Sequence, residues 1–145
     1  MIRESQAKDL ECIMQIWLTC NIETHHYVEK EYWLQNYEVV KKAISNGVYV
    51  YEEKGELLGF LGYIDSYIAG IFVNKEYRSK GIGKQLLDHA KSKNLSLSLD
   101  VFSNNKKAIG FYQREGFQII HTHINEDTGL AEYRMEWTMT DEEVR

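Results

Sequence analysis

The sequence predicts a mixed α/β (α+β) fold in which about seven strands form one central sheet and about four helices flank it. Three patterns carry this prediction: helical spacing of apolar residues near the N-terminus, period-two alternation in short segments, and an apolar strand that runs through a glycine loop into a helix. The expected element order is β-α-α-β-β-β-α-β-α-β-β. A chain of 145 residues is long enough for a core, so residues 1–145 are expected to form a single domain.

The N-terminal third is expected to hold one short strand, residues 2–4, and two helices. Ser5 is expected to cap the first helix, with Asp9 near its positive end. Apolar residues recur in this helix at i, i+3, i+4, i+7 and i+8, and they are Leu10, Ile13, Met14, Trp17 and Leu18. A second helix is expected over residues 31–46, because Asn46-Gly47 ends a helix in the usual way.

The rest of the chain is expected to alternate strands with two further helices. Residues 48–53 and 56–64 have the pattern of a hairpin around Lys54-Gly55, and residues 95–101 alternate between apolar and polar side chains. The other expected elements are strands at 67–73, 117–124 and 130–138, helices at 83–93 and 105–116, and a short frayed acidic tail at 141–143.

The net charge of -5 is unevenly distributed along the chain. Residues 75–114 contain nine basic and three acidic side chains, a balance of +6, so the remainder carries -11. A basic segment in an acidic chain favours a small polyanion as ligand and disfavours nucleic acid as a partner. The sequence lacks both the run of roughly 20 apolar residues that a membrane helix needs and a signal peptide, so a cytoplasmic protein without membrane contact is expected.

A phosphate-binding loop is predicted between residues 69 and 84. Ile71-Phe72-Val73 is apolar without alternation, which is typical of a central strand covered on both faces. Gly81 and Gly83 allow the backbone to turn tightly with its N–H groups directed at one point, where a helix begins and its dipole attracts anions. Further positive charge comes from Arg78, Lys80 and Lys84.

Two known phosphate-loop patterns do not fit this stretch, and a third does. The ATP-loop pattern fails because Gln85 stands at its Ser/Thr position, and the dinucleotide pattern fails because Leu86 stands at its third glycine. R-x-x-G-x-G at residues 78–83, directly after an apolar strand, resembles the acetyl-CoA pyrophosphate loop of the GNAT superfamily of N-acetyltransferases.

Two further stretches resemble the same superfamily. Residues 105–117 are similar to the GNAT pattern N-x-x-A-x-x-x-Y-x-x-x-G-F. The N-terminal pattern W-L…H-x-[FY]-[IV]…Y-W, between residues 17 and 33, resembles a small bacterial group typified by YjaB and YiaC. Together the three stretches extend the resemblance over nearly the whole chain.

The resemblance implies a fold and a cosubstrate. In the GNAT fold a mixed, mostly antiparallel sheet splays apart between its fourth and fifth strands, and acetyl-CoA lies in the gap. Backbone groups of the fourth strand would pair with the pantetheine arm, and those of the glycine loop would bind the pyrophosphate. The implied cofactor-binding residues are Ile71, Phe72, Val73, Arg78, Ser79, Lys80, Gly81, Ile82, Gly83, Lys84, Asn105, Lys107, Ala108 and Tyr112.

The implied reaction moves an acetyl group from acetyl-CoA to the primary amine of a small molecule, a protein lysine or a protein N-terminus. Tyr112 matches the family tyrosine near the thioester sulfur, and a phenol of pKa about 10 can reprotonate a thiolate of pKa about 8.5 as general acid. Asn105 matches the family asparagine that hydrogen-bonds the pantetheine arm, and it can also cap its own helix.

The sequence leaves the general base open. Residues 67–73 contain no carboxylate, whereas Asp65 lies just before this strand and Asp100 lies on a neighbouring one. His25 is the preferred histidine, as a base or as part of the acceptor site, and a water relay is the alternative. His26, His121 and His123 titrate in the same range. An aromatic acceptor pocket is expected around Tyr27, Tyr32, Trp33 and Tyr63.

A different class of answer is a binding module, a GNAT-like domain that holds CoA without useful catalysis. The intact Tyr112 and glycine loop favour the enzyme, and the missing strand carboxylate leaves room for the module. A toxin that acylates charged tRNA is disfavoured by the acidic balance outside the basic segment. The enzyme is expected to be a monomer or homodimer that needs no metal, with Cys12 and Cys20 packed as free thiols.

Overall fold

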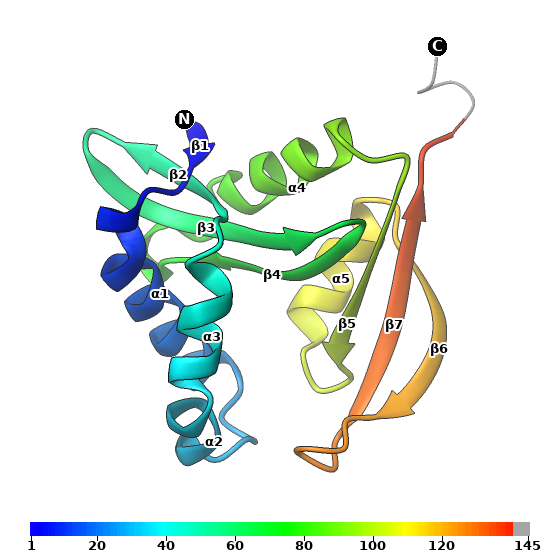
Figure 1. Cartoon of the computed structure of the whole chain (residues 1–145). Coiled ribbons are helices and arrows are strands. Elements are labelled where there is room, and N and C mark those ends of the chain that lie inside the picture. Colours follow the sequence, from blue (N-terminus) through cyan, green and yellow to red (C-terminus); the bar gives the residue numbers. More distant parts are fainter. Residues whose placement is uncertain (141–145) are drawn as a thin grey trace. The chain divides into compact units, whose positions relative to one another are not determined.

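The computed structural model describes residues 1–140 and confirms the expected mixed α/β fold (Figure 1). The strands are β1 (Ile2–Glu4), β2 (Tyr49–Glu53), β3 (Glu56–Ile64), β4 (Tyr67–Val73), β5 (Ser96–Phe102), β6 (Gln118–Ile124) and β7 (Ala131–Thr138). The α-helices are α1 (Leu10–Thr24), α2 (Lys30–Gln35), α3 (Tyr37–Ile44), α4 (Ile82–Ser92) and α5 (Lys106–Arg114). The acidic tail expected at 141–143 lies outside the described residues.

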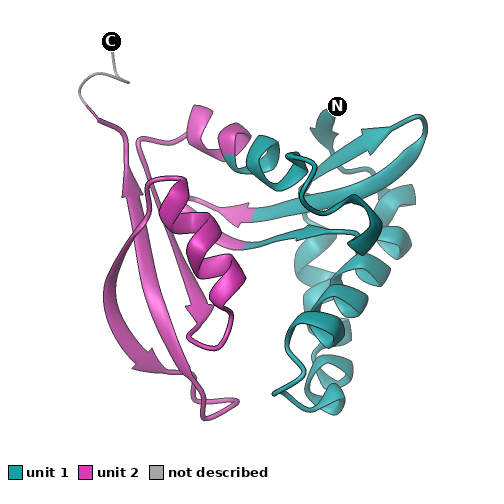
Figure 2. Ribbon diagram, turned by 180° about the vertical axis from the view of Figure 1, so that it is seen from behind, with its two compact units in different colours: residues 1–62, 70–87 teal, residues 63–69, 88–145 magenta. Residues whose placement is uncertain are grey.

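The seven strands form one sheet in the order β1-β2-β3-β4-β5-β7-β6. The chain divides into two compact units, which Figure 2 colours separately: residues 1–62 with 70–87, and residues 63–69 with the chain from 88 onward. The expectation of a single domain stays a prediction. No helix within residues 1–140 is both long enough and apolar enough to cross a membrane.

The first unit joins an antiparallel set of strands to helices α1, α2 and α3. β1 pairs with β2, and β2 pairs with β3, which places Val50 opposite Phe60. The predicted apolar stripe of α1 is buried at Met14 and Trp17, and Val50 and Phe60 are also buried. Burial of these large side chains, each worth roughly 1.5–3 kcal/mol, is what stabilises this unit.

Ser5 does not cap the first helix. Its hydroxyl accepts a hydrogen bond from the N–H of Val48 at 3.0 Å, and its own N–H donates to the Val48 carbonyl, so the chain is still extended and paired there. The N–H of Gln6 instead donates to the Asp9 carboxylate at 2.7 Å, beside the 3₁₀ turn Ala7–Asp9 that leads into α1. The N-cap prediction for Ser5 is therefore wrong.

The helix expected over residues 31–46 forms two helices, α2 and α3, which meet at Asn36. The side-chain amide of Asn36 donates to the carbonyl of Tyr32 at 2.7 Å, the same carbonyl that its backbone N–H reaches at 3.2 Å. Asparagine side chains compete in this way with the helix hydrogen bonds and lower helix propensity. The break therefore comes from a local side-chain bond that apolar periodicity does not report.

The second unit is a sheet with one apolar and one polar face. β5 pairs with β7 along its whole length, with Leu99 opposite Met135 and Asp100 opposite Arg134. Leu99 and Met135 are fully buried, and helix α5 lies in front of these strands when the molecule is seen from behind (Figure 2). In the view of Figure 1, the other face of β5 and β7 is turned toward the reader with no helix of its own unit over it.

Strand β4 was expected to be buried on both faces, and this is wrong for its last three residues. Ile68 is buried, whereas Ile71, Phe72 and Val73 are only half-buried. The parallel register with β5 pairs Tyr67 with Ser98 and Ile68 with Leu99, at the beginning of the strand. The apolar composition of β4 therefore does not mean that all of it is covered within the fold.

Candidate active site

The glycine loop after β4 contains two residues in the left-handed conformation. Ser79 has a φ of 65° and Gly81 a φ of 85°, so two left-handed residues alternate with others just before α4 begins. Such alternation turns successive N–H groups toward one point, and the positive end of α4 adds to it. Gly83 lies inside the first turn of α4. The second bend therefore comes from Ser79 and not, as the sequence suggested, from Gly83.

The side chain of Arg78 is turned back onto the protein. Its Nε donates to the carbonyl oxygen of Val73 at 2.9 Å, and its Nη2 lies 3.3 Å from the sulfur of Cys20 on α1. Cys20 is buried as expected, whereas Cys12 is exposed, so the packing prediction is wrong for Cys12. The contact between Cys20 and the loop was missed, since no sequence pattern links residues so far apart.

The end of β4 is held close to β3 by a glycine. A Cβ added at Gly59 would lie 2.6 Å from the carbonyl oxygen of Phe72, a distance that real Cβ atoms do not show. The ring of Phe72 stacks on Phe60 with centroids 4.9 Å apart and planes at 21°. The backbone of Phe72 and Val73 thus lies close against β3, while Ile71, Phe72 and Val73 stay half-buried.

Helix α5 carries the second family motif as predicted. The side-chain oxygen of Asn105 accepts from the N–H of Ala108 at 3.3 Å, so Asn105 is the N-cap. Tyr112 is buried, with its ring 5.4 Å from Phe117. Burial raises the pKa of the Tyr112 hydroxyl, so it is protonated at neutral pH. Lys107 is exposed on the first turn.

His25 lies in the predicted aromatic cluster of the first unit. Its Nδ1 is hydrogen-bonded to the hydroxyl of Tyr27, and its ring stacks on Trp33 with centroids 5.6 Å apart. Tyr32 contacts the same tryptophan edge-on. Burial lowers the pKa of His25 to about 4 and raises that of Tyr27 to about 12, so both are neutral at pH 7. Tyr63 belongs to the second unit.

The two carboxylates near β4, Asp100 and Asp65, differ in their surroundings: Asp100 is hydrogen-bonded to other side chains and Asp65 lies in an exposed turn. Asp100 accepts two hydrogen bonds from Arg134, at 2.9 and 3.1 Å, and one from the hydroxyl of Tyr67 at 2.7 Å. Burial acts to raise its pKa, but the bonds from Arg134 and Tyr67 prevail and lower it. Asp65 is exposed in the β3–β4 turn with a φ of 57°, a conformation that Asp tolerates.

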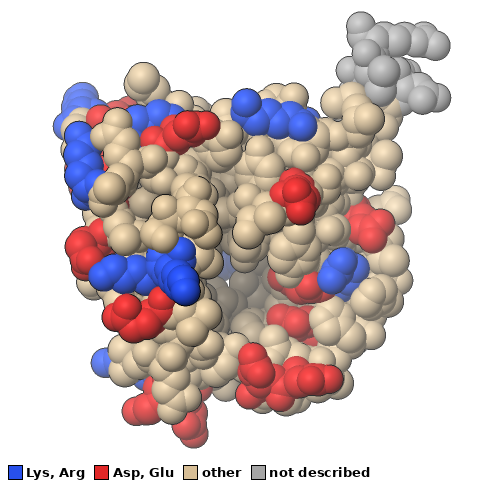
Figure 3. Space-filling view, in the orientation of Figure 1, with Lys and Arg blue, Asp and Glu red and all other residues tan. Residues whose placement is uncertain are grey.

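The polar face of the second unit carries mainly negative charge. Figure 3, in the orientation of Figure 1, shows acidic side chains predominating over β5, β7 and the turn between β6 and β7. His123 also lies there, with Nε2 at 3.1 Å from Glu132 and 3.5 Å from Asp100. An acidic surface of this kind attracts cationic molecules, the charge that a primary amine carries at neutral pH.

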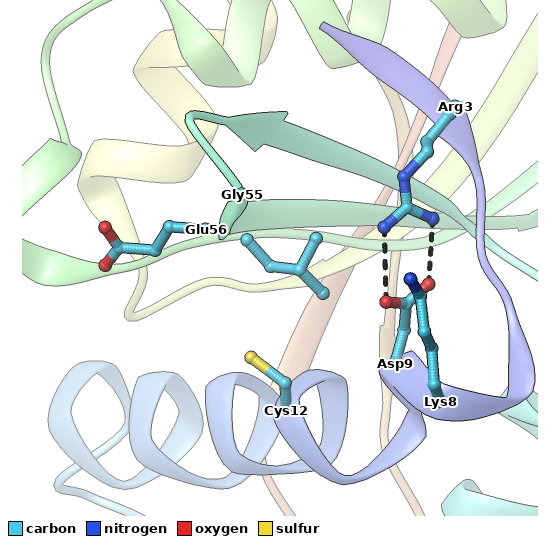
Figure 4. Close-up of a pocket in the computed structure, with 7 residues that line it drawn as sticks. Arg3, Lys8, Asp9, Cys12, Gly55 and Glu56 are labelled. Carbon is cyan, nitrogen blue, oxygen red and sulfur yellow. Dashed lines mark hydrogen bonds and ion pairs between the residues drawn. The ribbon is translucent and has the colours of Figure 1, made fainter.

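A separate pocket of about 420 Å³ lies beside the β2–β3 turn and the start of α1 (Figure 4). Figure 4 shows Arg3 facing Asp9, which it contacts at 2.8 and 3.2 Å, and Glu52 occupies its remaining side at 2.6 Å. These bonds lower the pKa of Asp9 and raise that of Arg3. The pocket contains no residue of the predicted motifs, and its Arg3 and Asp9 are already paired with each other.

Within residues 1–140 no group of three or more His, Cys, Asp or Glu side chains is placed to hold a metal ion. The glycine loop, the capped helix α5 and the aromatic cluster contain residues that the sequence motifs singled out. The loop and the cluster belong to the first unit, and α5 belongs to the second.

Comparison with known proteins agrees with the resemblance. Residues 45–119 match the acetyltransferase (GNAT) domain. The chain is 34% identical to the peptidyl-lysine N-acetyltransferase YiaC of Escherichia coli strain K12, over 94% of this chain and 96% of YiaC. It is 25% identical to the peptidyl-lysine N-acetyltransferase YjaB of the same strain, over 88% of each chain.

Two solved structures have the same fold. The solution structure of apo-form YjaB from Escherichia coli matches with a TM-score of 0.85 and 22% identity, over 97% of this chain and 98% of YjaB. The PaiA N-acetyltransferase from Thermoplasma acidophilum, crystallised in complex with coenzyme A, matches with a TM-score of 0.75 and 21% identity, over 95% and 99%.

Proposed function

Because the chain belongs to the GNAT acetyltransferase family, we propose that it acetylates the side-chain amine of lysine in peptides or proteins. Transfer of an acetyl group from acetyl-CoA to a primary amine is the activity of this family and of this chain. The observation that carries the lysine proposal is the similarity to YiaC over nearly the whole chain. The acidic face of the second unit supports it, since a lysine side chain is cationic.

The glycine loop and the end of β4 are proposed to bind acetyl-CoA, which supplies the acetyl group as a thioester. The left-handed residues Ser79 and Gly81 support binding of the pyrophosphate by backbone N–H groups of the loop. The half-buried end of β4 supports backbone pairing with the pantetheine arm at Ile71 and Val73. Arg78 is proposed to contact acetyl-CoA through its backbone only, because its side chain is bonded to Val73 and Cys20. The further residues proposed to contact acetyl-CoA are Phe72, Lys80, Ile82, Gly83, Lys84, Asn105, Lys107, Ala108 and Tyr112.

Tyr112 is proposed as the general acid. When the amine nitrogen bonds to the acetyl carbon and the C–S bond breaks, the sulfur leaves with the electron pair and needs a proton, which Tyr112 supplies. The match of Tyr112 to the family tyrosine supports this role. Burial raises the pKa of its hydroxyl, so the phenol carries its proton at neutral pH but is a weaker acid than an exposed tyrosine. Asn105 is proposed to donate its amide N–H to the pantetheine arm while its oxygen caps α5.

The proton that leaves the amine has several possible acceptors. Asp100 is a poor one, because its pKa is lowered and its oxygens already accept from Arg134 and Tyr67. His25, with a pKa of about 4, is a weak base. It is therefore proposed to contact the acceptor together with Tyr27 and Trp33, and the base is Asp65 or a water relay.

The protein is proposed to work in the cytoplasm as a single domain, as a monomer or homodimer, without nucleic-acid or membrane partners. The acidic balance of -11 outside residues 75–114 supports the exclusion of nucleic acid, whose phosphates such a surface repels. Size-exclusion chromatography with light scattering measures the oligomeric state directly.

Release of free CoA thiol from acetyl-CoA tests the function. The acceptor panel contains lysine peptides, peptides with a free N-terminus only, polyamines, amino acids and aminoglycosides, and mass spectrometry identifies the acetylated atom. Lysine peptides are expected to be the best acceptors. Tyr112→Phe is expected to lose about 10²-fold or more in kcat while binding CoA as the wild type does in calorimetry.

Three results would contradict parts of this proposal. CoA binding without thiol release on any acceptor would make the chain a binding module. Turnover with polyamines and none with lysine peptides would overturn the lysine assignment. Undiminished turnover of Tyr112→Phe would remove the general-acid role.

A further inference from the structure

We propose that Arg78 and Cys20 form a latch that positions the pyrophosphate loop, so that Arg78 acts through the loop backbone and not as a charge on the phosphates. This rests on the proposed function, because it takes residues 78–84 as the loop that binds the pyrophosphate of acetyl-CoA. Both residues are then positioning residues for cosubstrate binding, and Cys20 lies on α1, far in sequence from the R-x-x-G-x-G motif.

Three hydrogen bonds form a closed triangle at the end of β4. Arg78 Nε donates to the carbonyl oxygen of Val73 at 2.9 Å, and the thiol of Cys20 donates to the same oxygen at 3.4 Å. Arg78 Nη2 donates to the sulfur of Cys20 at 3.3 Å. Because Val73 ends β4 and Arg78 starts the R-x-x-G-x-G motif, the triangle ties the two ends of the intervening turn to α1.

The thiol form of Cys20 is what the triangle requires. Cys20 is 5% exposed, and burial raises its pKa, although the bond from Arg78 acts in the opposite direction. At neutral pH the sulfur therefore keeps its hydrogen, which it donates to Val73 while accepting from Arg78. A thiolate would place a negative charge against the Val73 carbonyl and have no proton to donate.

A second contact joins the same helix to the same turn. Glu23 lies one turn after Cys20 on α1. Its Oε2 is 3.9 Å from Nζ of Lys75, which belongs to the 3₁₀ turn Lys75–Tyr77. The loop that follows contains Ser79, a non-glycine residue in the left-handed region, which costs free energy and persists only where the surroundings hold it. The latch supplies that support by holding Arg78, the residue directly before Ser79.

The test compares variants that keep charge with variants that keep shape, using calorimetric titration with CoA. Arg78→Lys keeps the positive charge but loses the fork that reaches Val73 and Cys20 together. We expect Arg78→Lys and Cys20→Ala each to bind CoA about tenfold more weakly, equivalent to about 1.4 kcal/mol. The double variant is expected to lose little more than the worse single one, because both remove the same triangle.

Matched controls separate the latch from a general loss of stability. Cys12→Ala changes an exposed cysteine of the same helix and is expected to bind CoA normally. Acetyl-pantetheine, which lacks the pyrophosphate, is expected to show a KM within about twofold of wild type in every variant, while the KM for acetyl-CoA rises and kcat does not change. Cys20→Ser keeps a donor and an acceptor, and its expected CoA affinity lies between those of wild type and Cys20→Ala.

Several outcomes would overturn the latch. One is an Arg78→Lys variant that binds CoA like the wild type while Arg78→Ala binds it more weakly. That result would mean that the positive charge of Arg78 attracts the phosphates directly. Others are a Cys20→Ala variant no weaker than Cys12→Ala, and fully additive losses in the double variant. A wild type that binds no CoA would overturn both latch and loop. Because calorimetry needs no acceptor, a wild type that binds CoA without transferring acetyl contradicts the proposed function and leaves the latch measurable.

Discussion

The left-handed conformation of Gly81 shapes the loop that is proposed to bind the pyrophosphate. Its φ is 85°, and a Cβ added there would meet no atom within 4 Å. Replacement by alanine therefore brings conformational strain without a steric clash. The strain falls on the loop whose N–H groups are proposed to bind the pyrophosphate, so both stability and CoA affinity should respond.

Gly81→Ala is expected to lower the free energy of unfolding by about 1–2 kcal/mol, the cost of a left-handed conformation for an L-residue. It is also expected to weaken CoA binding about tenfold or more, since an altered φ turns the N–H groups away from their common point. Urea denaturation measures the first effect and calorimetric titration the second.

Gly55→Ala is the matched control for this change. Gly55 has a φ of 80°, lies in the turn between β2 and β3, and likewise has no atom within 4 Å of an added Cβ. The same loss of stability is expected without any loss of CoA affinity. Equal weakening of CoA binding by both variants would show that global destabilisation, and not the loop, controls the affinity.

Helix α5 shows how one side chain can serve an element and a ligand together. Asn105 caps the helix through its oxygen, which accepts from the N–H of Ala108. Its amide nitrogen is the atom proposed to bind the pantetheine arm. The two atoms of one amide can be separated by substitution, because aspartate keeps the acceptor and has no donor.

Asn105→Asp is expected to keep the wild-type free energy of unfolding within about 0.5 kcal/mol and to raise the KM for acetyl-CoA several-fold. Asn105→Ala is expected to raise this KM similarly and also to lose about 1 kcal/mol of stability with the cap. Thermal denaturation and steady-state kinetics distinguish the two. An Asn105→Asp enzyme with an unchanged KM would leave Asn105 as a cap only.

At the same scale, periodicity located the elements and missed two local events. The helix expected over 31–46 divides at Asn36, because its side chain bonds the Tyr32 carbonyl. Ser5 pairs with Val48 and does not cap α1. Both errors have one cause: a polar side chain forms a hydrogen bond with the backbone that the spacing of apolar residues does not predict.

On the scale of the whole molecule, stability should depend on pH through half-buried histidines, one in each unit. Burial lowers the pKa of His25 from 6.5 to about 4, and it lowers that of His89 as well. A histidine whose folded pKa lies below its unfolded value stabilises the fold fully above the unfolded pKa. That contribution is lost as the pH falls toward the folded pKa.

The free energy of unfolding is therefore expected to decrease by on the order of 2 kcal/mol between pH 6.5 and about 4. His25→Gln should remove a large part of this decrease, whereas substitution of the exposed His121 by glutamine should leave it intact. Urea denaturation at a series of pH values measures both. A wild-type stability that is flat across this window would show that the surroundings of His25 do not lower its pKa.

The order of the strands, the position of the glycine loop, the cap at Asn105 and the family were determined by the sequence alone, because each depends on residues close together in the chain. The tertiary structure decided which distant groups meet: Arg78 with Cys20, Asp100 with Arg134 and Tyr67, and His25 with Trp33. These contacts shift the pKa values of the groups involved. They also determine which donors and acceptors are already hydrogen-bonded within the protein. They separate residues suited to binding or proton transfer from those that only hold the fold together, because charge and burial depend on three-dimensional neighbours.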